Sequence, residues 1–156
     1  MVTVMRVSAE SIFSDARFDA LAGAYADETG HPLYATGFVV QREAYRLLDE
    51  KGLLYAYAVS VDGVLHGFGA VVKSESFHTG KPTAICDTIF VDAEGRKRGA
   101  GMALMSALRS AAKEIGAPAL VVNARSGTKL DRIMSIAERR GLAEHVYNSY
   151  LLTGEL

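Results

Sequence analysis

The chain has 156 residues, a formal net charge of −1 at pH 7, one cysteine and four histidines. This length suits one domain with a hydrophobic core that needs no disulfide or structural metal, and we expect a single domain over residues 1–156. The near-neutral charge argues against a nucleic-acid-binding protein, which normally carries a basic excess over the whole domain. The lone cysteine, Cys86, excludes an internal disulfide, and histidines without paired spacing argue against a metal site.

The apolar segments of the chain are short. The N-terminal sequence MVTVMRVSAE lacks the charged start, the long apolar stretch and the cleavage site of a signal peptide. No apolar run approaches the length of a membrane-spanning helix. We therefore expect a soluble cytoplasmic protein that has no membrane partner.

The first half of the chain is predicted to begin with a strand and two helices and to continue into a β-hairpin, over residues 3–7, 11–30, 39–52 and 53–75. The second helix ends at Gly52, a residue type that favours helix C-termini. The hairpin is centred on Asp62 and Gly63, a dipeptide that tolerates the positive φ angles of a two-residue turn.

The second half is predicted to alternate strands over 83–91, 119–124 and 144–152 with helices over 99–116 and 126–141. In the first of these helices, apolar residues share one stripe of the surface: Met102, Met105, Leu108, Ala112 and Ile115. The short terminal strand can pair with a copy of itself, which suggests a homodimer. An antiparallel hairpin followed by a β-α-β-α-β run indicates an α/β domain with a mixed sheet flanked by helices.

The segment FVDAEGRKRGAGMAL, residues 90–104, places three basic residues and three glycines between a strand and a helix. Glycines let backbone N–H groups converge on an anion, and the positive end of the following helix adds a partial charge. A dinucleotide-binding Rossmann loop would place a third glycine where Leu104 stands, and the G-K-[ST] sequence of a P-loop is absent. A nucleotide-binding domain is therefore kept only as an alternative.

Several segments together resemble the GNAT superfamily of N-acetyltransferases. The spacing Arg96-x-x-Gly99-x-Gly101, directly after IFVD, resembles the acetyl-CoA-binding motif of this superfamily. VSVDGVLHGFGAVV resembles its second and third strands, TIFVDAEGRKRGAG its fourth strand and pyrophosphate loop, and IAERRGL the end of a later helix. The resemblance runs from about Leu53 to Leu142. It implies a single-domain GNAT-like α/β fold with a mixed, splayed sheet.

The resemblance implies acetyl-CoA as co-substrate and assigns it a binding site. The N–H groups of Arg98 to Met102 would wrap the pyrophosphate, with basic side chains adding attraction, and the edge Ile89 to Val91 would bind the pantetheine arm and the thioester carbonyl. Ser126 or Lys129 would contact the thiol end, although a helix cap by Ser126 or Thr128 is the alternative explanation of the hydroxyls. The predicted cofactor-binding residues are Ile89, Phe90, Val91, Arg96, Lys97, Arg98, Gly99, Ala100, Gly101, Met102 and Ser126.

Acetylation of an amine requires loss of a proton, because an ordinary amine is mostly protonated at neutral pH. Asp87, which interrupts an apolar strand, is the predicted general base; a structural aspartate satisfied by local donors is the alternative. His78 is a second candidate base. Ala137 stands where the superfamily often has a tyrosine that protonates the departing sulfur. Tyr150, with Tyr147, is the predicted replacement, and ordinary packing on an alternating strand is the alternative role of both tyrosines.

These features predict an N-acetyltransferase that transfers an acetyl group directly from acetyl-CoA to an amine. Cys86 would permit a route through a thiol, but a cysteine in an apolar strand usually only packs. A GNAT-like module that binds acyl-CoA without catalysis is the alternative, in view of Ala137. The acceptor stays open between a small-molecule amine, an antibiotic, a peptide amino terminus and a protein lysine. The resemblance implies that segments 20–48 and 74–82 select the acceptor.

Overall fold

The computed structural model describes residues 1–146, except for the side chains of Ala35 and Thr36. The chain divides into two compact units, Met1–Asn123 and Ala124–Leu156, of which the second is described as far as residue 146. The first unit holds the described sheet, and the second holds helix α6 (Lys129–Arg139). The predicted strand over 144–152 lies largely outside the described residues, and the single domain stays a prediction.

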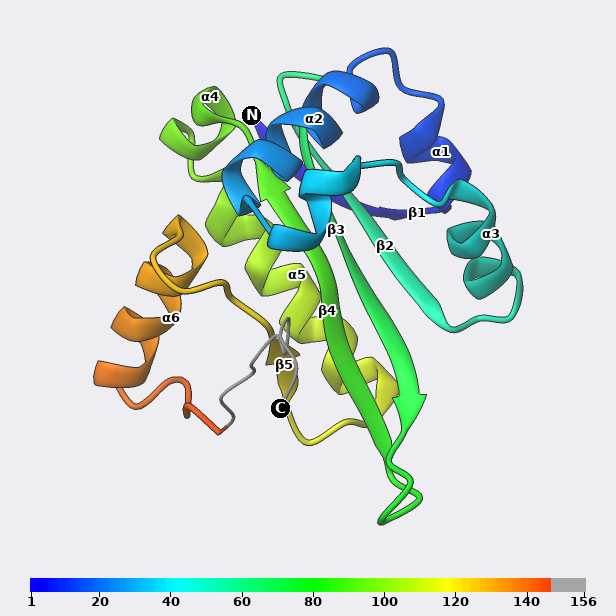
Figure 1. The fold of residues 1–156 in the computed structure, drawn as a ribbon, viewed down its shortest axis with the longest axis vertical. Helices are drawn as coiled ribbons and strands as arrows, with labels where there is room; N and C mark the ends of the chain where they lie inside the picture. The colour runs from blue at the N-terminus through cyan, green and yellow to red at the C-terminus, as the bar shows by residue number, and fades with distance from the viewer. Residues whose placement is uncertain (147–156) are drawn as a thin grey trace. The chain divides into compact units, whose positions relative to one another are not determined.

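The sheet of the first unit has five strands in the order β1-β2-β3-β4-β5 (Figure 1). The strands are β1 (Val2–Val7), β2 (Leu54–Val61), β3 (Val64–Glu75), β4 (Pro82–Val91) and β5 (Leu120–Val122). β1 to β4 pair antiparallel and β5 is parallel to β4, which confirms the predicted mixed sheet. Asp62 and Gly63 join β2 to β3 with φ angles of 52° and 83°, and the predicted hairpin is confirmed.

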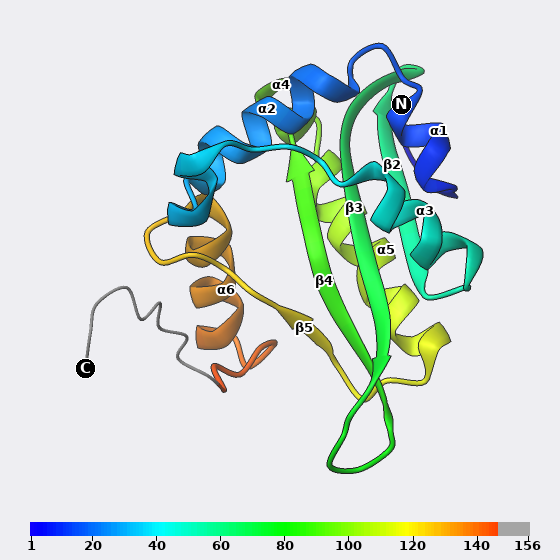
Figure 2. The ribbon, with the colours of Figure 1, turned by 45° about the vertical axis from the view of Figure 1, so that its right-hand side comes forward.

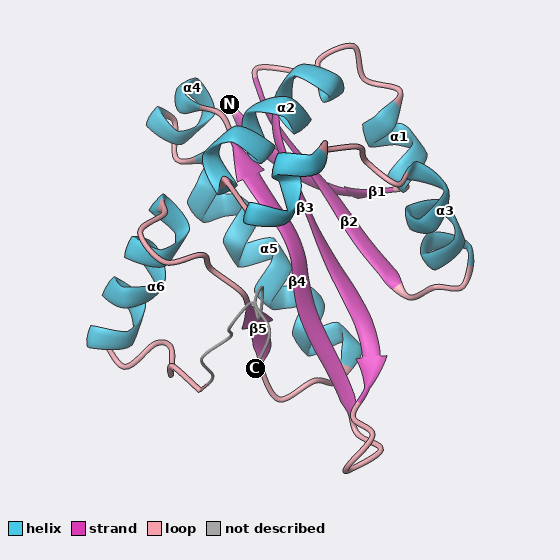
Figure 3. Cartoon of the chain, viewed as in Figure 1, coloured by secondary structure: helices cyan, strands magenta, loops and turns pink. Residues whose placement is uncertain are grey.

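Helices cover both faces of this sheet (Figures 2 and 3). They are α1 (Ala9–Phe13), α2 (Phe18–Thr29), the 3-10 helix η1 (Pro32–Thr36), α3 (Arg42–Glu50), α4 (Ala93–Lys97) and α5 (Ala100–Ile115). α5 packs on one face, whereas α1, α2 and α3 lie on the other. The predicted α/β class with a helix-flanked sheet is therefore confirmed.

The prediction of one helix over 11–30 is wrong, because this segment contains the end of α1, a turn and α2. The Ser14 hydroxyl donates to Glu10 Oε1 at 3.2 Å, and its backbone N–H donates to the Glu10 carbonyl at 3.0 Å. Asp15 Oδ1 then accepts the N–H of Arg17 at 2.8 Å. The Ser14 N–H bond is still helical, but the Asp15 carboxylate replaces a backbone acceptor for the Arg17 N–H. Such competition from a short polar side chain ends the helical pattern here.

Helix α5 supplies much of the core on its face of the sheet, where Leu104 and Leu108 are fully buried. The predicted place of Met102 on the buried stripe is wrong, because Met102 is 72% exposed. The buried positions are Ala100, Leu104, Leu108, Ala111, Ala112 and Ile115. Met102 lies two residues from Leu104, a rotation of about 200° around the helix axis, and so faces away from the sheet.

A β-bulge interrupts the pairing of β3 with β4 at Asp87. Cys86 and Thr88 pair with adjacent residues of β3, so Asp87 between them has no partner on that strand. A bulge disturbs the alternation of side chains along a strand. Cys86 and Ile89 both belong to the core that α5 covers, while Asp87 and Thr88 both face the opposite side of the sheet.

The strands β4 and β5 separate at the same place. They pair only at Ala84, Ile85 and Cys86 of β4, and the described chain offers residues 87–91 no strand partner on that edge. β3 continues to pair with β4 on the other edge as far as Val91. This separation confirms the predicted splayed sheet and leaves main-chain groups of β4 without a sheet partner.

The second unit contains α6, whose N-cap is Thr128. Thr128 Oγ1 accepts the N–H of Asp131 at 3.3 Å, and a helix within the predicted range 126–141 is confirmed. Through residue 146, no helix combines the length and the apolar composition that crossing a membrane requires. The same residues contain no group of three His, Cys, Asp or Glu side chains arranged to hold a metal ion.

The main chain of β4 lies very close to Gly67 of β3, and we therefore expect Gly67→Ala to destabilise the fold. A Cβ there would lie 2.2 Å from the Phe90 carbonyl oxygen and 2.8 Å from Val91 Cα. Because main-chain atoms cannot move aside alone, the free energy of unfolding should fall by about 1–3 kcal/mol or more in urea titrations. Gly23→Ala, on α2 with nothing within 4 Å, should raise it by up to about 1 kcal/mol. Equal stability of Gly67→Ala and the parent would contradict this reading of the strand contact.

Candidate functional site

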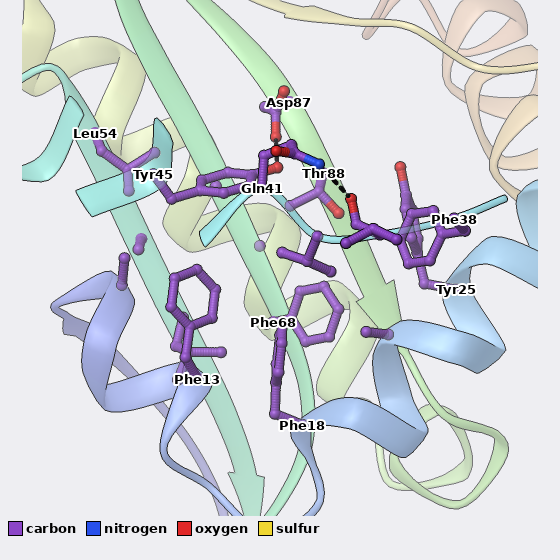
Figure 4. A pocket seen from close by; sticks show the side chains of 18 of the residues that line it. Phe13, Phe18, Tyr25, Phe38, Gln41, Tyr45, Leu54, Phe68, Asp87 and Thr88 are labelled. Carbon is purple, nitrogen blue, oxygen red and sulfur yellow. Dashed lines mark hydrogen bonds between the residues drawn. The ribbon is translucent and has the colours of Figure 1, made fainter. Parts of the chain in front are cut away.

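A cavity of about 390 Å³ lies between the sheet and α1, α2, η1 and α3 (Figure 4). It lies entirely within the first unit, and β2, β3 and β4 contribute its floor. Tilted ring pairs help to form the walls, with centroids 5.5 Å apart for Phe18 and Phe68. The aromatic lining residues are Phe13, Phe18, Tyr25, Tyr34, Phe38, Tyr45 and Phe68. A cavity of this size and character suits a small organic molecule.

The polar side chains of this pocket gather at one end (Figure 4). Asp87 is the one charged residue among the described residues that line the cavity. The Tyr45 hydroxyl donates to Asp87 Oδ2 at 2.5 Å, and Thr88 and Gln41 lie at the same end. The bulge makes this possible, because it turns two consecutive β4 residues toward the pocket.

Sequence reasoning does not identify Tyr45, which reaches Asp87 from α3. Its only sequence feature is a place among apolar residues of a predicted helix, which indicates packing. Burial, and then the neighbouring Asp87, raise the pKa of Tyr45 well above its ordinary value. Tyr45 therefore keeps its proton and acts as a hydrogen-bond donor to the carboxylate.

Tyr25 and Thr88 add two hydroxyl groups to the pocket wall. Burial, and then the neighbouring Tyr34, raise the pKa of Tyr25 to about 12, so this phenol also stays protonated. Thr88 lies close to Tyr25 and acts to lower the pKa of its phenol. Among the described residues, however, no atom forms a hydrogen bond with Thr88 Oγ1. The walls of the pocket thus add hydroxyl groups and no second charge.

The loop before α5 carries the predicted basic cluster, and each of its three cations has a carboxylate partner. The N–O distances are 2.9 Å for Arg96 with Glu28, 2.7 Å for Lys97 with Glu94 and 3.3 Å for Arg98 with Asp62. Glu28 and Asp62 come from α2 and the hairpin turn, so the loop sequence alone does not reveal them. Their negative charges offset the predicted attraction of anions, which leaves anion binding chiefly to the main chain.

The main chain at the start of α5 offers fewer donors than predicted. The N–H groups of Arg98 and Gly99 donate within the turn to the carbonyls of Gly95 and Arg96, both at 3.1 Å. The predicted donor set is corrected to Ala100, Gly101 and Met102, whose first-turn N–H groups have no backbone acceptor within the described chain. These three groups point outward from the positive end of a 16-residue helix.

Glycine keeps the space above these donors open. Gly99 has a φ of 82° as the N-cap of α5, a conformation that favours glycine. A Cβ built on Gly99 or Gly101 would meet no atom within 4 Å. Three convergent N–H groups beside two open glycine positions fit the diphosphate of a CoA molecule.

The predicted edge Ile89 to Val91 lies on the part of β4 that β5 does not cover. Phe90 and Val91 are buried in the cores on opposite faces of the sheet, and Ile89 packs against the α5 core. Their side chains are therefore committed to packing, and only their main-chain groups can meet a cofactor at this edge.

Cys86 and His78 are less suited to chemistry at the pocket. Burial, and then the charge of Asp87, raise the pKa of the Cys86 thiol to about 12, and the thiol donates to the Thr88 carbonyl at 3.6 Å. Cys86 also faces α5 rather than the pocket. His78 is exposed in the turn between β3 and β4 and is not among the lining residues.

Three further predicted residues lie outside the first unit. Ser126 is exposed in the turn before α6, and Thr128, the alternative cap, forms the helix cap. The predicted contact of Ser126 with the cofactor stays a prediction. Tyr147 and Tyr150, the predicted replacements for the general acid, lie outside the described residues.

The sequence of the chain matches a known protein family. Residues 16–147 match the family described as the acetyltransferase (GNAT) family. The chain belongs to the GNAT family. No curated protein matches its sequence.

Solved GNAT-type structures share the fold over nearly the whole chain. A ribosomal-protein-alanine N-acetyltransferase from Brucella melitensis biovar Abortus 2308 has a TM-score of 0.69 and 22% identity, covering 99% of this chain and 100% of that one. An aminoglycoside acetyltransferase from an uncultured soil metagenomic sample gives 0.71 and 19%, with 99% of each chain covered. Glucosamine-6-phosphate N-acetyltransferase from Arabidopsis thaliana gives 0.67 and 14%, also with 99% of each chain covered.

In this GNAT protein, Asp92 holds in place the start of the glycine loop, which is the segment between β4 and α5. It caps α4 by accepting the Gly95 N–H at 2.8 Å, and it also contacts His66 Nδ1 at 2.9 Å and Arg17 at 3.0 Å. Burial alone would raise the pKa of Asp92, but the bonds from Gly95 and His66 and the charge of Arg17 hold it below its ordinary value. Asp92 thus ties the loop to β3 and to the start of α2.

We expect Asp92→Asn to lower the free energy of unfolding at pH 7 by about 1–3 kcal/mol, because the contacts to His66 and Arg17 lose their charge. The folded-state pKa lies below the ordinary 3.8, so the carboxylate stabilises the fold above about pH 4. Its contribution is lost as the pH falls through the folded-state pKa. Urea titrations from pH 7 to below pH 3 should show the gap between variant and parent closing.

Glu94→Gln is a matched control for this experiment, because its pair with Lys97 is about 70% exposed on both sides. It should change the stability by less than about 1 kcal/mol at any pH. A gap for Asp92→Asn that persists unchanged in acid would contradict a role for the carboxylate charge.

Proposed function

We propose that this chain is an acetyl-CoA-dependent N-acetyltransferase that transfers the acetyl group directly to an amine bound in the pocket. One observation carries the proposal: Asp87, hydrogen-bonded by Tyr45, stands at the polar end of the pocket, beside the point where β4 leaves β5. In the GNAT fold this gap is expected to admit the thioester arm. A carboxylate at that position meets both the amine and the group to be transferred.

The chain contributes binding groups for the co-substrate. When bound, acetyl-CoA supplies an activated acetyl thioester. The N–H groups of Ala100, Gly101 and Met102 hold the pyrophosphate, and the main chain of Ile89 to Val91 binds the arm. Ser126 keeps its proposed contact with the thiol end.

Asp87 accepts a proton from the bound ammonium, directly or through a water molecule, while Tyr45 keeps the carboxylate in place. The nitrogen then forms a bond to the acetyl carbon as the carbon–sulfur bond breaks. The products are the amide and CoA, whose sulfur takes up a proton, and the net reaction releases one proton from the ammonium. Tyr150 is proposed as the donor of the proton to sulfur.

Direct transfer is favoured over a thiol intermediate. The raised pKa of Cys86, its burial and its orientation toward α5 make it a poor nucleophile for anything in the pocket. An amine acceptor agrees with the neighbouring structures, whose names state action on a ribosomal-protein alanine, aminoglycosides and glucosamine-6-phosphate.

A second candidate function is a GNAT-like module that binds acyl-CoA without catalysis. Ala137 favours it, because the superfamily often has a tyrosine acid at that position. Binding of acetyl-CoA is common to both candidates. Product formation with an amine distinguishes them.

We expect CoA and acetyl-CoA, but not NAD, to raise the melting temperature, because a ligand of the native state stabilises it by mass action. Gly101→Val should abolish this shift while leaving the melting temperature of the ligand-free protein nearly unchanged. Its branched side chain would enter the open space over the helix N-terminus without a strained backbone.

Gly99→Val should abolish the shift as well, but its φ of 82° adds backbone strain, so Gly101→Val is the cleaner variant. Differential scanning fluorimetry with each ligand measures both effects. Normal CoA binding by a folded Gly101→Val protein would mean that the loop is not the pyrophosphate site.

Asp87→Asn should reduce kcat about 100- to 10,000-fold, the usual contribution of a general base, while affinity for acetyl-CoA is retained. The acidic limb of the pH–rate profile should weaken in this variant. Release of CoA thiol gives the rate, and calorimetry gives the cofactor affinity. Glu114→Gln, exposed near the C-terminal end of α5 on the opposite face of the sheet, serves as a control that should retain the parent rate. Full activity of a folded Asp87→Asn protein would remove Asp87 from the mechanism.

A further inference from the structure

The charge of the pocket restricts what it can bind. Among its described lining residues, Asp87 is the sole acid and none is lysine, arginine or histidine. The phenols of Tyr25 and Tyr45 keep their protons, so they add no charge at neutral pH. The Arg42 guanidinium lies over the rings of Phe13 and Phe18, at 5.5 and 5.4 Å from their centroids, but it does not line the cavity. A phosphate group would therefore meet no cation among the lining residues, and a molecule with several ammonium groups would find one carboxylate for all of them.

The remaining lining is suited to an apolar body. Phe13, Phe18 and Phe68 lie away from the polar end, and their rings face the interior of the pocket (Figure 4). Apolar surface placed against such walls gains roughly 25 cal/mol per Å² removed from water. The hydroxyl groups of a sugar would lose water there without enough partners, so these walls select against them.

The two ends of the pocket fix the direction of a ligand. Asp87 is the first β4 residue beyond the last pair with β5, which is Cys86 with Val122. A positively charged nitrogen bound at Asp87 therefore lies where the two strands begin to separate. From there the pocket extends over Phe68 toward α1 and α2.

We propose that the acceptor is a small primary amine with one positive charge and an aromatic body, held with its nitrogen at Asp87 and its ring among Phe13, Phe18 and Phe68. This inference rests on the proposed acetyltransferase function. The amine nitrogen forms a bond to the acetyl carbon, the carbon–sulfur bond breaks, and the products are an amide, CoA and one proton. Because the amide is neutral, it loses its ion pair with Asp87, and this favours product release.

Binding is tested first without turnover, by calorimetry on protein saturated with CoA, which carries no acetyl group. The probes are phenethylamine, ethylamine, which lacks the ring, and phenethyl alcohol, which lacks the charge. Phenethylamine should bind about 10- to 100-fold more tightly than ethylamine, from burial of the ring. The affinity for phenethylamine should also exceed that for phenethyl alcohol by about 10-fold or more, because only the ammonium forms a charged hydrogen bond with Asp87.

Asp87→Asn should remove the preference for amine over alcohol, whereas Glu114→Gln, on the opposite face of the sheet from the pocket, should retain it. Phe68→Leu should reduce the affinity for phenethylamine and leave that for ethylamine nearly unchanged. The melting temperature of each variant shows whether it is folded. Equal affinity of the parent for all three probes would overturn the proposed acceptor class.

Turnover is then compared with acetyl-CoA and three acceptors: phenethylamine, tobramycin and glucosamine-6-phosphate. Phenethylamine should have the highest kcat/KM, with its amide identified by mass spectrometry. A higher kcat/KM for either polar acceptor would overturn the acceptor class while leaving the acetyltransferase function intact. Binding of phenethylamine with no acetylation of any acceptor would instead support the ligand class and overturn the proposed catalysis.

Discussion

One extra residue in β4 determines how the two faces of the sheet are used. Without the bulge at Asp87, regular alternation would direct Asp87 and Thr88 to opposite faces. The bulge turns both toward the pocket and returns Ile89 to the core that α5 covers. The same position ends the pairing with β5, so the polar end of the pocket and the open strand edge coincide.

The pocket and the cofactor loop rest on different kinds of interaction. At the loop, the donors are main-chain N–H groups of α5, and the nearby cations are paired with carboxylates from other elements. Such a site depends on glycine and helix geometry more than on particular side chains. The pocket depends on side chains, because its lining consists mainly of aromatic and aliphatic side chains with one carboxylate among the described residues.

Long-range contacts connect these two regions to the N-terminal helices. Arg17 and Glu28, near opposite ends of α2, pair with Asp92 and Arg96 of the glycine loop. Tyr45 of α3 pairs with Asp87 of β4. The helices that form the walls of the pocket thus also hold the loop before α5, so a substitution in α2 can affect both regions.

The sequence by itself determined the features that depend on neighbouring residues. Helical periodicity gave α5, the Asp62-Gly63 dipeptide gave the hairpin, and an aspartate within an apolar strand identified Asp87 as a residue that needs a special environment. Family resemblance supplied the splayed sheet and the hypothesis that the loop before α5 binds CoA. Only the tertiary structure decided the bulge, the partner Tyr45 and the carboxylates opposite the loop cations. Strand register and pairs such as Arg96 with Glu28 join residues far apart in the chain, and local patterns contain no information on which distant side chain completes a contact.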